Sequence, residues 1–79
     1  MTKAIIYTAD ICPACDMAKN FFSSKNIPYE EFNVNVDKDA RDKMIRMTNQ
    51  TGVPVIEYKG EVLIGFRPRT LEKLANSPV

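Results

Sequence analysis

The sequence predicts an α/β domain in which a four-stranded mixed sheet is flanked by three helices, in the chain order βαβαββα. A short apolar run at residues 3–8 is followed by residues with helical spacing, and a second succession of strand and helix starts near residue 31. A Lys-Gly pair at residues 59–60 signals a tight turn between two further strands. The 79 residues suffice for one small domain, so we predict a single domain over residues 1–79.

The overall composition argues against several classes of function. Eleven Lys and Arg against ten Asp and Glu give a formal charge of +1, which provides no large field for collecting nucleic acid or a charged membrane. No apolar stretch approaches a membrane span, and the N-terminus leads into a strand without the apolar region of a signal peptide. We therefore expect a cytoplasmic monomer with small protein or peptide partners.

The first strand and helix are predicted over residues 3–8 and 13–25. Ile5 and Ile6 are apolar on both sides of the strand, as expected of a central strand covered on both faces. Asn26 and the Pro that follows shortly after it stop the helix. Four apolar residues recur at helical spacing and are expected to face the sheet: Met17, Ala18, Phe21 and Phe22.

The second strand and helix are expected from about residue 31 to residue 50. Phe32, Val34 and Val36 alternate with polar residues, which is the period of an edge strand with one buried face. Asp37 can cap the helix, and Gly52 suits the left-handed position after it. Its core residues are predicted to be Ala40, Met44 and Met47. A short strand–helix–strand unit closes right-handed, so the first two strands should be parallel neighbours.

The last third of the chain is predicted to contain a hairpin and a helix. The third strand begins at residues 53–56, and the fourth spans residues 61–64 after the Lys-Gly turn. Gly65 ends the hairpin, and Pro68 opens the last helix. The buried face of this helix is expected to carry Leu71, Leu74 and Ala75.

Two cysteines, Cys12 and Cys15, lie where the first strand gives way to the first helix. With Cys12 at the N-cap, Pro13 occupies the first helical position and Cys15 lies one turn further on the same side. Unpaired N–H groups and the helix dipole stabilise a thiolate at the cap. We therefore predict that Cys12 is the nucleophile and Cys15 the resolving thiol.

Three other uses of the two cysteines were weighed. A zinc ion needs four ligands, and the chain has no other Cys and no His, so no metal is expected within one chain. A structural disulfide that closes so small a loop removes little entropy from the unfolded chain. Unpaired core cysteines do not fit a strand-to-helix boundary that exposes Cys12. The sequence therefore favours a redox-active disulfide, Cys12–Cys15, with no bound cofactor.

The dithiol occurs together with a Val53-Pro54 pair before the third strand and with Gly65 before the last helix. Over essentially the whole chain, this combination resembles the glutaredoxin branch of the thioredoxin fold, which implies a thioredoxin-like (glutaredoxin) fold and disulfide reduction. By that resemblance the Val53–Pro54 bond is cis and the backbone of Val53 pairs with an incoming peptide or glutathione. Without the resemblance, a trans Pro at the first residue of a strand is expected.

Two positions bear on the electron donor. Glutathione-using glutaredoxins typically carry Lys where this chain has Ala9, and acids where Phe66 and Arg67 follow the glycine. The Gly-Phe-Arg-Pro segment is instead similar to that of NrdH redoxins, which are reduced by thioredoxin reductase with NADPH and supply ribonucleotide reductase. Pro13 between the thiols resembles glutaredoxins. The resemblance therefore implies thioredoxin reductase as donor, with glutathione as the alternative.

The remaining expectations concern contacts around the dithiol. Arg67 and Arg69 flank the proline of a helix N-terminus, where the dipole disfavours cations, so they either bind an acidic group or extend into water. A non-catalytic thioredoxin-fold binding module and a dimeric iron–sulfur carrier using Cys12 and glutathione stay open as other functions. Substrate contacts are expected at Thr8, Asp10, Ile11, Pro13, Val53, Pro54, Gly65, Phe66 and Arg67.

Overall fold

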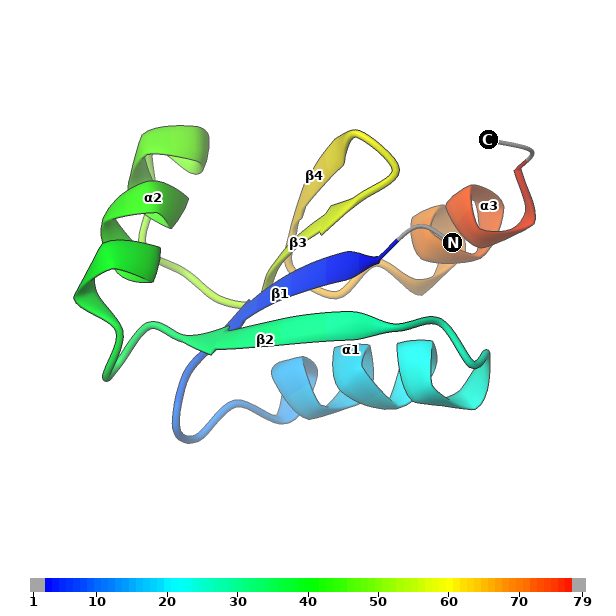
Figure 1. Ribbon diagram of the computed structural model, residues 1–79, viewed down its shortest axis with the longest axis horizontal. Helices are drawn as coiled ribbons and strands as arrows, with labels where there is room; N and C mark the ends of the chain where they lie inside the picture. The colour runs from blue at the N-terminus through cyan, green and yellow to red at the C-terminus, as the bar shows by residue number, and fades with distance from the viewer. Residues whose placement is uncertain (1–2, 78–79) are drawn as a thin grey trace.

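A computed structural model describes residues 3–77, and these residues form the seven predicted elements in the predicted order (Figure 1). The bounds are β1 (Ala4–Thr8), α1 (Pro13–Ser24), β2 (Tyr29–Asn33), α2 (Lys38–Thr48), β3 (Val55–Tyr58), β4 (Glu61–Ile64) and α3 (Pro68–Asn76). In the described part of the chain, no helix is long and apolar enough to cross a membrane.

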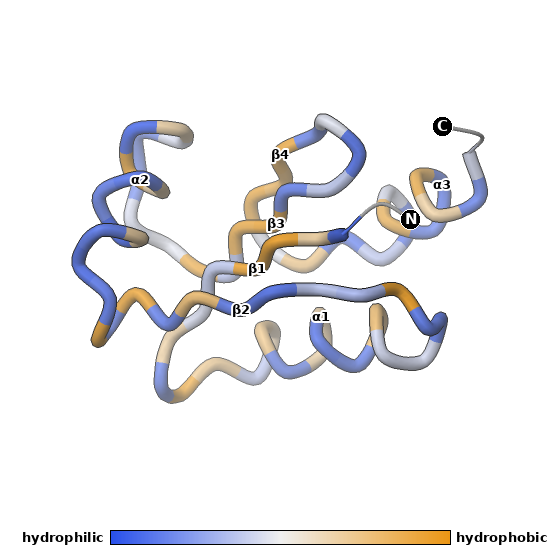
Figure 2. Tube along the Cα trace, viewed as in Figure 1, coloured by the Kyte–Doolittle hydropathy of each residue, from blue (hydrophilic) through white to orange (hydrophobic). Residues whose placement is uncertain are grey.

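The four strands form one mixed sheet in the spatial order β2-β1-β3-β4. β2 runs parallel to β1, whereas β3 runs antiparallel to both β1 and β4. β1 is therefore internal and β2 is an edge strand, as predicted. Hydrophobic residues are prominent along β1 and β3, and β2 is mostly hydrophilic (Figure 2).

The sheet is covered by α1 and α3 on one face and by α2 on the other (Figure 1). The larger core lies beneath α1 and α3, where Phe22 and Leu71 are fully buried against Ile6 and Ile56 of the sheet. Beneath α2, Met44 packs with the ring and aliphatic side chains of β1 and β3. β1 thus supplies buried side chains to both faces, and its C-terminal end leads directly to the dithiol.

The second strand begins and ends earlier than the alternation of Phe32, Val34 and Val36 predicted. Its register is set by pairing with β1 from Ala4 opposite Tyr29 onward. After Asn33 the chain turns, and Val36 is 79 % exposed. The bounds predicted from the alternation were wrong because the apolar residues Val34 and Val36 lie in the turn after the strand. The pairing with β1 determines where β2 begins and ends.

The ends of the helices follow local hydrogen bonding. Asp37 caps α2 as predicted, because its Oδ1 accepts a hydrogen bond of 3.0 Å from the Ala40 N–H. The left-handed position at the end of α2 is taken by Asn49, with φ 57°, and not by Gly52. Asn tolerates this conformation better than most residues, so the helix ends two residues before the predicted end.

One residue of the predicted buried face of α1 is exposed. Cys15, Ala18 and Phe22 define the buried stripe, with spacings of three and four residues. Met17 precedes Ala18 by one position, about 100° around the helix, and is 52 % exposed. Met17 therefore belongs to the surface of α1 and not to the core.

The hairpin between β3 and β4 has the predicted Lys59-Gly60 turn, and both residues have positive φ, 50° and 80°. The Lys59 Nζ donates to the backbone oxygens of Leu74, at 2.7 Å, and Ser77, at 3.0 Å. The turn thereby binds the C-terminal end of α3. β3 starts at Val55, two residues later than predicted, immediately after Pro54.

Candidate functional site

Cys12 and Cys15 form a disulfide at the N-terminus of α1. Cys12 is the N-cap residue, and its Sγ accepts a hydrogen bond of 3.1 Å from the Cys15 N–H. Pro13 occupies the first helical position, where a missing N–H costs nothing. The sequence therefore encodes the geometry locally: the proline starts the helix and the cysteine before it serves as the cap.

The two sulfur-bearing residues differ in accessibility. Cys12 is half-buried, whereas Cys15 is 1 % exposed. An incoming disulfide can reach Cys12 first, and Cys15 lies behind it within reach of the Cys12 sulfur.

The Val53–Pro54 peptide bond is cis, as the resemblance implied. Pro54 is buried, and its carbonyl oxygen accepts a hydrogen bond of 2.7 Å from the Gly65 N–H. Gly65 has a φ of 87°, which an L-residue adopts only at a cost. Two segments predicted to contact substrate, around Pro54 and around Gly65, are therefore joined to each other.

Thr8, predicted at the rim, is instead buried, with 1 % exposure, at the end of β1. Its hydroxyl donates a hydrogen bond of 2.8 Å to Glu31 Oε2, and Lys19 Nζ lies 3.3 Å from the same oxygen. Lys19 also lies 3.5 Å from the carboxylate of Asp16. The hydrogen bond with Glu31 raises the pKa of Lys19 above its ordinary value.

This cluster escaped the sequence interpretation, although part of its signal was present. Lys19 follows Cys15 by four residues, so both lie on one side of α1. Glu31 lies opposite Ile6, and its side chain could be placed within reach of Thr8 and α1 only after the register of β2 was known. The cluster therefore links β1, β2 and α1 at the end of the sheet that carries the dithiol.

Ile11 and Asp10 lie on the loop between β1 and α1. Ile11 is 93 % exposed and stands directly before Cys12. Asp10 is exposed as well and hydrogen-bonds to Asn33, the last residue of β2, and to Asn35 of the loop that follows. The structure thus places Ile11 where a protein substrate can contact it and ties its neighbour to another loop.

Phe66 and Arg67 connect β4 to α3. Phe66 is half-buried and packs on the core beneath α1, with its ring centroid 6.5 Å from that of Phe21. Arg67 is the N-cap of α3 without a side-chain cap hydrogen bond, and its Nε donates to the Ile64 oxygen at 3.1 Å. Arg67 and Arg69 are both exposed, and the hydrogen bond to Ile64 fixes the position of the Arg67 side chain.

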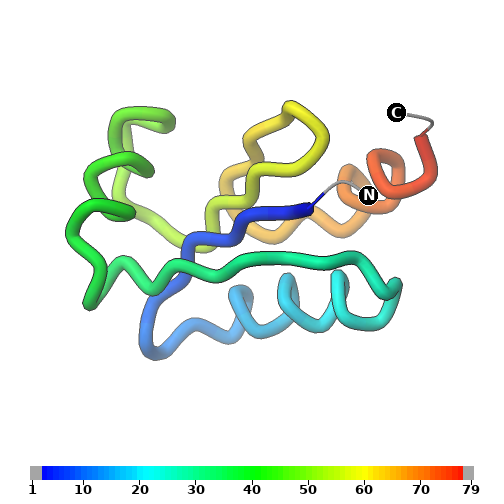
Figure 3. The backbone as a smooth tube through the Cα atoms, in the orientation of Figure 1, coloured from blue at the N-terminus to red at the C-terminus, as the bar shows by residue number. Residues whose placement is uncertain are grey.

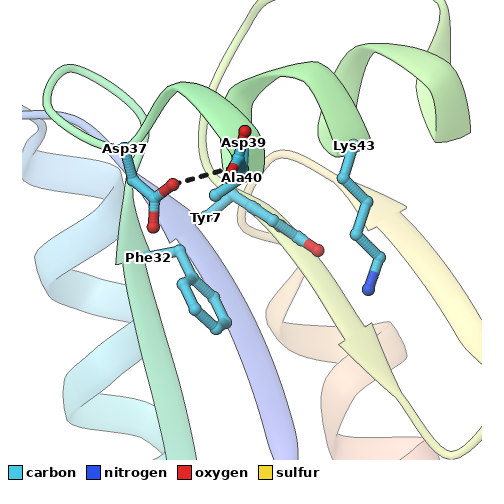
Figure 4. A pocket seen from close by; sticks show the side chains of 6 residues that line it. All are labelled: Tyr7, Phe32, Asp37, Asp39, Ala40 and Lys43. Atoms are coloured by element: carbon cyan, nitrogen blue, oxygen red, sulfur yellow. Dashed lines mark hydrogen bonds between the residues drawn. The ribbon is translucent and has the colours of Figure 1, made fainter.

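A separate cavity of about 270 Å³ lies between α2 and the sheet (Figure 4). Burial, followed by a hydrogen bond of 2.9 Å to Glu57, raises the pKa of the Tyr7 hydroxyl, so this group stays protonated at neutral pH. The cavity is lined by Tyr7, Phe32, Asp37, Asp39, Ala40 and Lys43. None of the predicted site residues lines it, and within residues 3–77 no group of Cys, His, Asp and Glu could hold a metal ion.

Comparison with known proteins agrees with this geometry. The glutaredoxin family model matches residues 4–63. The chain is 38 % identical, over 87 % of its length and 92 % of the relative's, to an uncharacterised glutaredoxin-like 8.6 kDa protein of Clostridium pasteurianum. It is 36 % identical to glutaredoxin 3 of Escherichia coli, over 71 % of this chain and 68 % of the relative. The solved structure of the NrdH-redoxin from Escherichia coli superposes with a TM-score of 0.80 at 25 % identity, covering 96 % of this chain and 99 % of that one.

Proposed function

The chain belongs to the glutaredoxin family, and we propose that it passes electrons from thioredoxin reductase to protein disulfides through Cys12 and Cys15. It is a thiol–disulfide oxidoreductase with a dithiol site in a thioredoxin-like fold. The roles of the two cysteines, the donor and the substrate are the proposal. Its main support is the position of Cys12, which is half-buried at the N-cap of α1 in front of a buried Cys15.

The mechanism follows from this difference in accessibility. The Cys12 thiolate attacks one sulfur of a substrate disulfide, and the other substrate sulfur leaves as a thiolate. Cys15 then loses its proton and attacks the Cys12 sulfur of the mixed disulfide, which releases the second substrate sulfur. The substrate gains two electrons and the protein is left with the Cys12–Cys15 disulfide, which the donor reduces.

Substrate contacts are proposed on the protein surface around Cys12. The backbone of Val53 pairs with an extended segment of the substrate, next to Pro54 and Gly65, which are hydrogen-bonded to each other. Ile11, directly before Cys12, supplies exposed apolar surface. The further proposed contacts are Pro13, Phe66 and Arg67. Thr8 is buried and Asp10 is bound to Asn33 and Asn35, so neither is proposed as a contact.

Thioredoxin reductase is the proposed donor because the site lacks charged groups suited to glutathione. Ala9 offers no cation, and Arg67 stands, exposed and anchored to Ile64, where an acid would receive the glutathione amino group. Each missing charged hydrogen bond costs about 1.5–3 kcal/mol, so two weaken glutathione binding by about two orders of magnitude or more. The similarity to an NrdH-redoxin supports this donor and makes ribonucleotide reductase a candidate substrate.

Glutathione is the second candidate donor. Pro13 lies between the thiols as in glutaredoxins, and the 36 % identity to glutaredoxin 3 favours the same assignment. Under either donor, two thiols kept reduced by a cellular reductase fit a cytoplasmic protein, which we propose here together with a monomeric state.

Parallel NADPH-consumption assays separate the two donors. We expect thioredoxin reductase to reduce the Cys12–Cys15 disulfide much faster than glutathione with glutathione reductase does, using enzymes from the same source organism. The double variant Ala9→Lys/Arg67→Asp should shift the preference toward glutathione, and Arg69→Asp serves as the matched control for the added carboxylate. Efficient turnover with glutathione and no coupling to thioredoxin reductase would make the protein an ordinary glutaredoxin.

A further inference from the structure

The loop that carries Cys12 has little secondary structure to hold it. Residues 9–12 lie between the end of β1 and the start of α1 and belong to neither. Asp10 is exposed, and Ile11, the residue before Cys12, is 93 % exposed and packs on nothing. The Cys12 oxygen accepts a hydrogen bond of 3.1 Å from the Asp16 N–H, so α1 holds Cys12 on one side, and contacts of residues 9–11 must hold it on the other.

Two hydrogen bonds join the loop to residues at and after the end of β2, and a third lies between those residues. Asn33 Nδ2 donates to Asp10 Oδ1 at 2.7 Å, and the Asp10 N–H donates to Asn35 Oδ1 at 3.0 Å. The Asn35 N–H donates in turn to Asn33 Oδ1 at 2.8 Å. These bonds close a ring of three residues, which we call the Asp10 clasp. The two loops that it joins lie 23 and 25 residues apart in sequence and meet at the same end of the sheet (Figure 3).

The base of the clasp is firmly held, unlike the loop. Asn33 is the last residue of β2 and pairs with Thr8 in the sheet. The next residue, Val34, donates its N–H to the Thr8 oxygen at 2.8 Å. The Asn33 oxygen accepts hydrogen bonds from the N–H groups of Val36, at 3.2 Å, and Asp37, at 2.9 Å, which close the turn into α2. The turn after β2 is therefore held by backbone hydrogen bonds, and it binds the loop at Asp10.

The chemistry of the clasp suits this task. Asp10 contributes an ionised acceptor, and hydrogen bonds to a charged group are shorter and stronger than those between neutral groups. Asp10 also donates its backbone N–H, so both its side chain and its backbone are hydrogen-bonded. Two bonds restrain the loop at this residue more tightly than one would. The restraint acts two residues before Cys12.

We propose that the Asp10 clasp is a positioning device that holds Cys12 in place for Cys15 and so stabilises their disulfide. A dithiol already held near the geometry of its disulfide loses less conformational freedom on closing the bond. Loosening the loop lowers the effective concentration of the two thiols for each other and makes the protein a weaker reductant. The proposal rests on Cys12 and Cys15 being the working pair of the proposed function.

An exchange of donor and acceptor tests the clasp. Asn33→Asp places a carboxylate against that of Asp10 and removes the Asn33–Asp10 bond. The double variant Asp10→Asn/Asn33→Asp restores this bond in the reverse direction and has the net charge of the original chain. Asn20→Asp, on the exposed side of α1, adds the same charge as Asn33→Asp without touching the clasp.

The readout is the equilibrium constant for disulfide formation between Cys12 and Cys15 in a glutathione redox buffer. We expect Asn33→Asp to lower it about three- to tenfold, with Asn20→Asp and the double variant within about twofold of the original protein. Urea unfolding of the oxidised forms, with midpoints that agree, shows that the change is not one of overall stability.

Two outcomes contradict the inference, and a third is distinct from both. Equal constants for Asn33→Asp and Asn20→Asp, or a double variant as low as Asn33→Asp, would overturn the clasp while leaving the proposed function standing. An original protein that forms no Cys12–Cys15 disulfide in the buffer would overturn the proposed function and the clasp with it.

Discussion

The N-termini of α1 and α3 have the same first helical residue, but the residues that precede it differ in chemical character. Both helices have a proline at the first helical position. In α1 the residue before the proline is Cys12, whose sulfur accepts an N–H of the first turn, and Asp16 adds an acid to that turn. In α3 the same place is taken by Arg67, which caps nothing and instead binds the Ile64 oxygen.

The N-terminus of α1 follows the preference of helix N-termini for anionic or capping groups, and that of α3 does not. An anion at the N-terminus of α1 is favoured by the unpaired N–H groups and the dipole, and we propose that in the reduced protein this anion is the Cys12 thiolate. At α3 a cation stands in the disfavoured position, and the terminus gains no side-chain cap. Arg67 therefore does not stabilise α3 as a side-chain cap, and its side chain donates instead to the Ile64 oxygen.

The largest effects are expected at the N-terminus of α1. Cys12→Ser should abolish disulfide reduction, because the hydroxyl is a far weaker nucleophile than the thiolate. Cys15→Ser should keep the first attack and trap a mixed disulfide with a protein substrate. Mass spectrometry of the two variants after incubation with an oxidised protein substrate measures both. Equal trapping by the two variants would contradict the assignment of nucleophile and resolving thiol.

The second prediction tests the thiolate itself. The alkylation rate of Cys12 in reduced protein should titrate below the pKa of an ordinary cysteine thiol, because the α1 terminus stabilises the charged form. The same protein in concentrated urea provides the control, since unfolding removes the helix terminus. A folded protein whose Cys12 titrates as it does in urea would show that the N-cap position leaves the thiol unchanged.

The third prediction reverses the chemistry of the α3 terminus. Arg67→Asp supplies a capping carboxylate, which should raise the free energy of unfolding by about 0.5–1 kcal/mol after the loss of the exposed hydrogen bond to Ile64. Arg69→Asp lies past the cap position and should give the smaller, dipole-only gain. Urea denaturation at low salt measures both. A destabilised Arg67→Asp variant would mean that the Arg67–Ile64 bond matters more than the empty cap.

Much of this comparison was predictable from sequence because helix starts are encoded locally. Pro13 and Pro68 marked the two starts, Asp37 was identified as the cap of α2, and the Lys-Gly pair fixed the hairpin. The cis Val53–Pro54 bond came from the family resemblance, since local preference alone favours trans.

The predictions for β2 and Thr8 failed because contacts between segments distant in sequence determine their structure. The bounds of β2 depend on pairing with β1, and the burial of Thr8 on its hydrogen bond to Glu31 of that strand. The Asp10 clasp joins loops more than twenty residues apart, so no local pattern could reveal it. The architecture was therefore predictable, whereas the contacts that hold the dithiol loop were not.

The smallest predicted effect concerns the ion pairs that Lys19 makes beside the first turn of α1. Lys19 lies 3.3 Å from Glu31 and 3.5 Å from Asp16, and the hydrogen bond with Glu31 raises the pKa of Lys19. Since the pKa of Lys19 is raised in the folded state, the Lys19–Glu31 pair makes its full contribution to the free energy of unfolding below the pKa of Lys in the unfolded chain. It is lost as the pH rises through the higher folded value.

Glu31→Gln should therefore destabilise the protein by less than about 1 kcal/mol at neutral pH, the usual range for partly exposed pairs. The difference from the original protein should shrink above the ordinary Lys pKa of 10.5. Glu30→Gln is the matched control, since the neighbouring residue of β2 pairs with the exposed Lys3 at 3.0 Å. Urea unfolding at neutral and alkaline pH measures both variants. Because only Glu31 also accepts the buried Thr8 hydroxyl, a Glu31→Gln variant no less stable than Glu30→Gln would remove this cluster from the contacts that stabilise the dithiol end of the sheet.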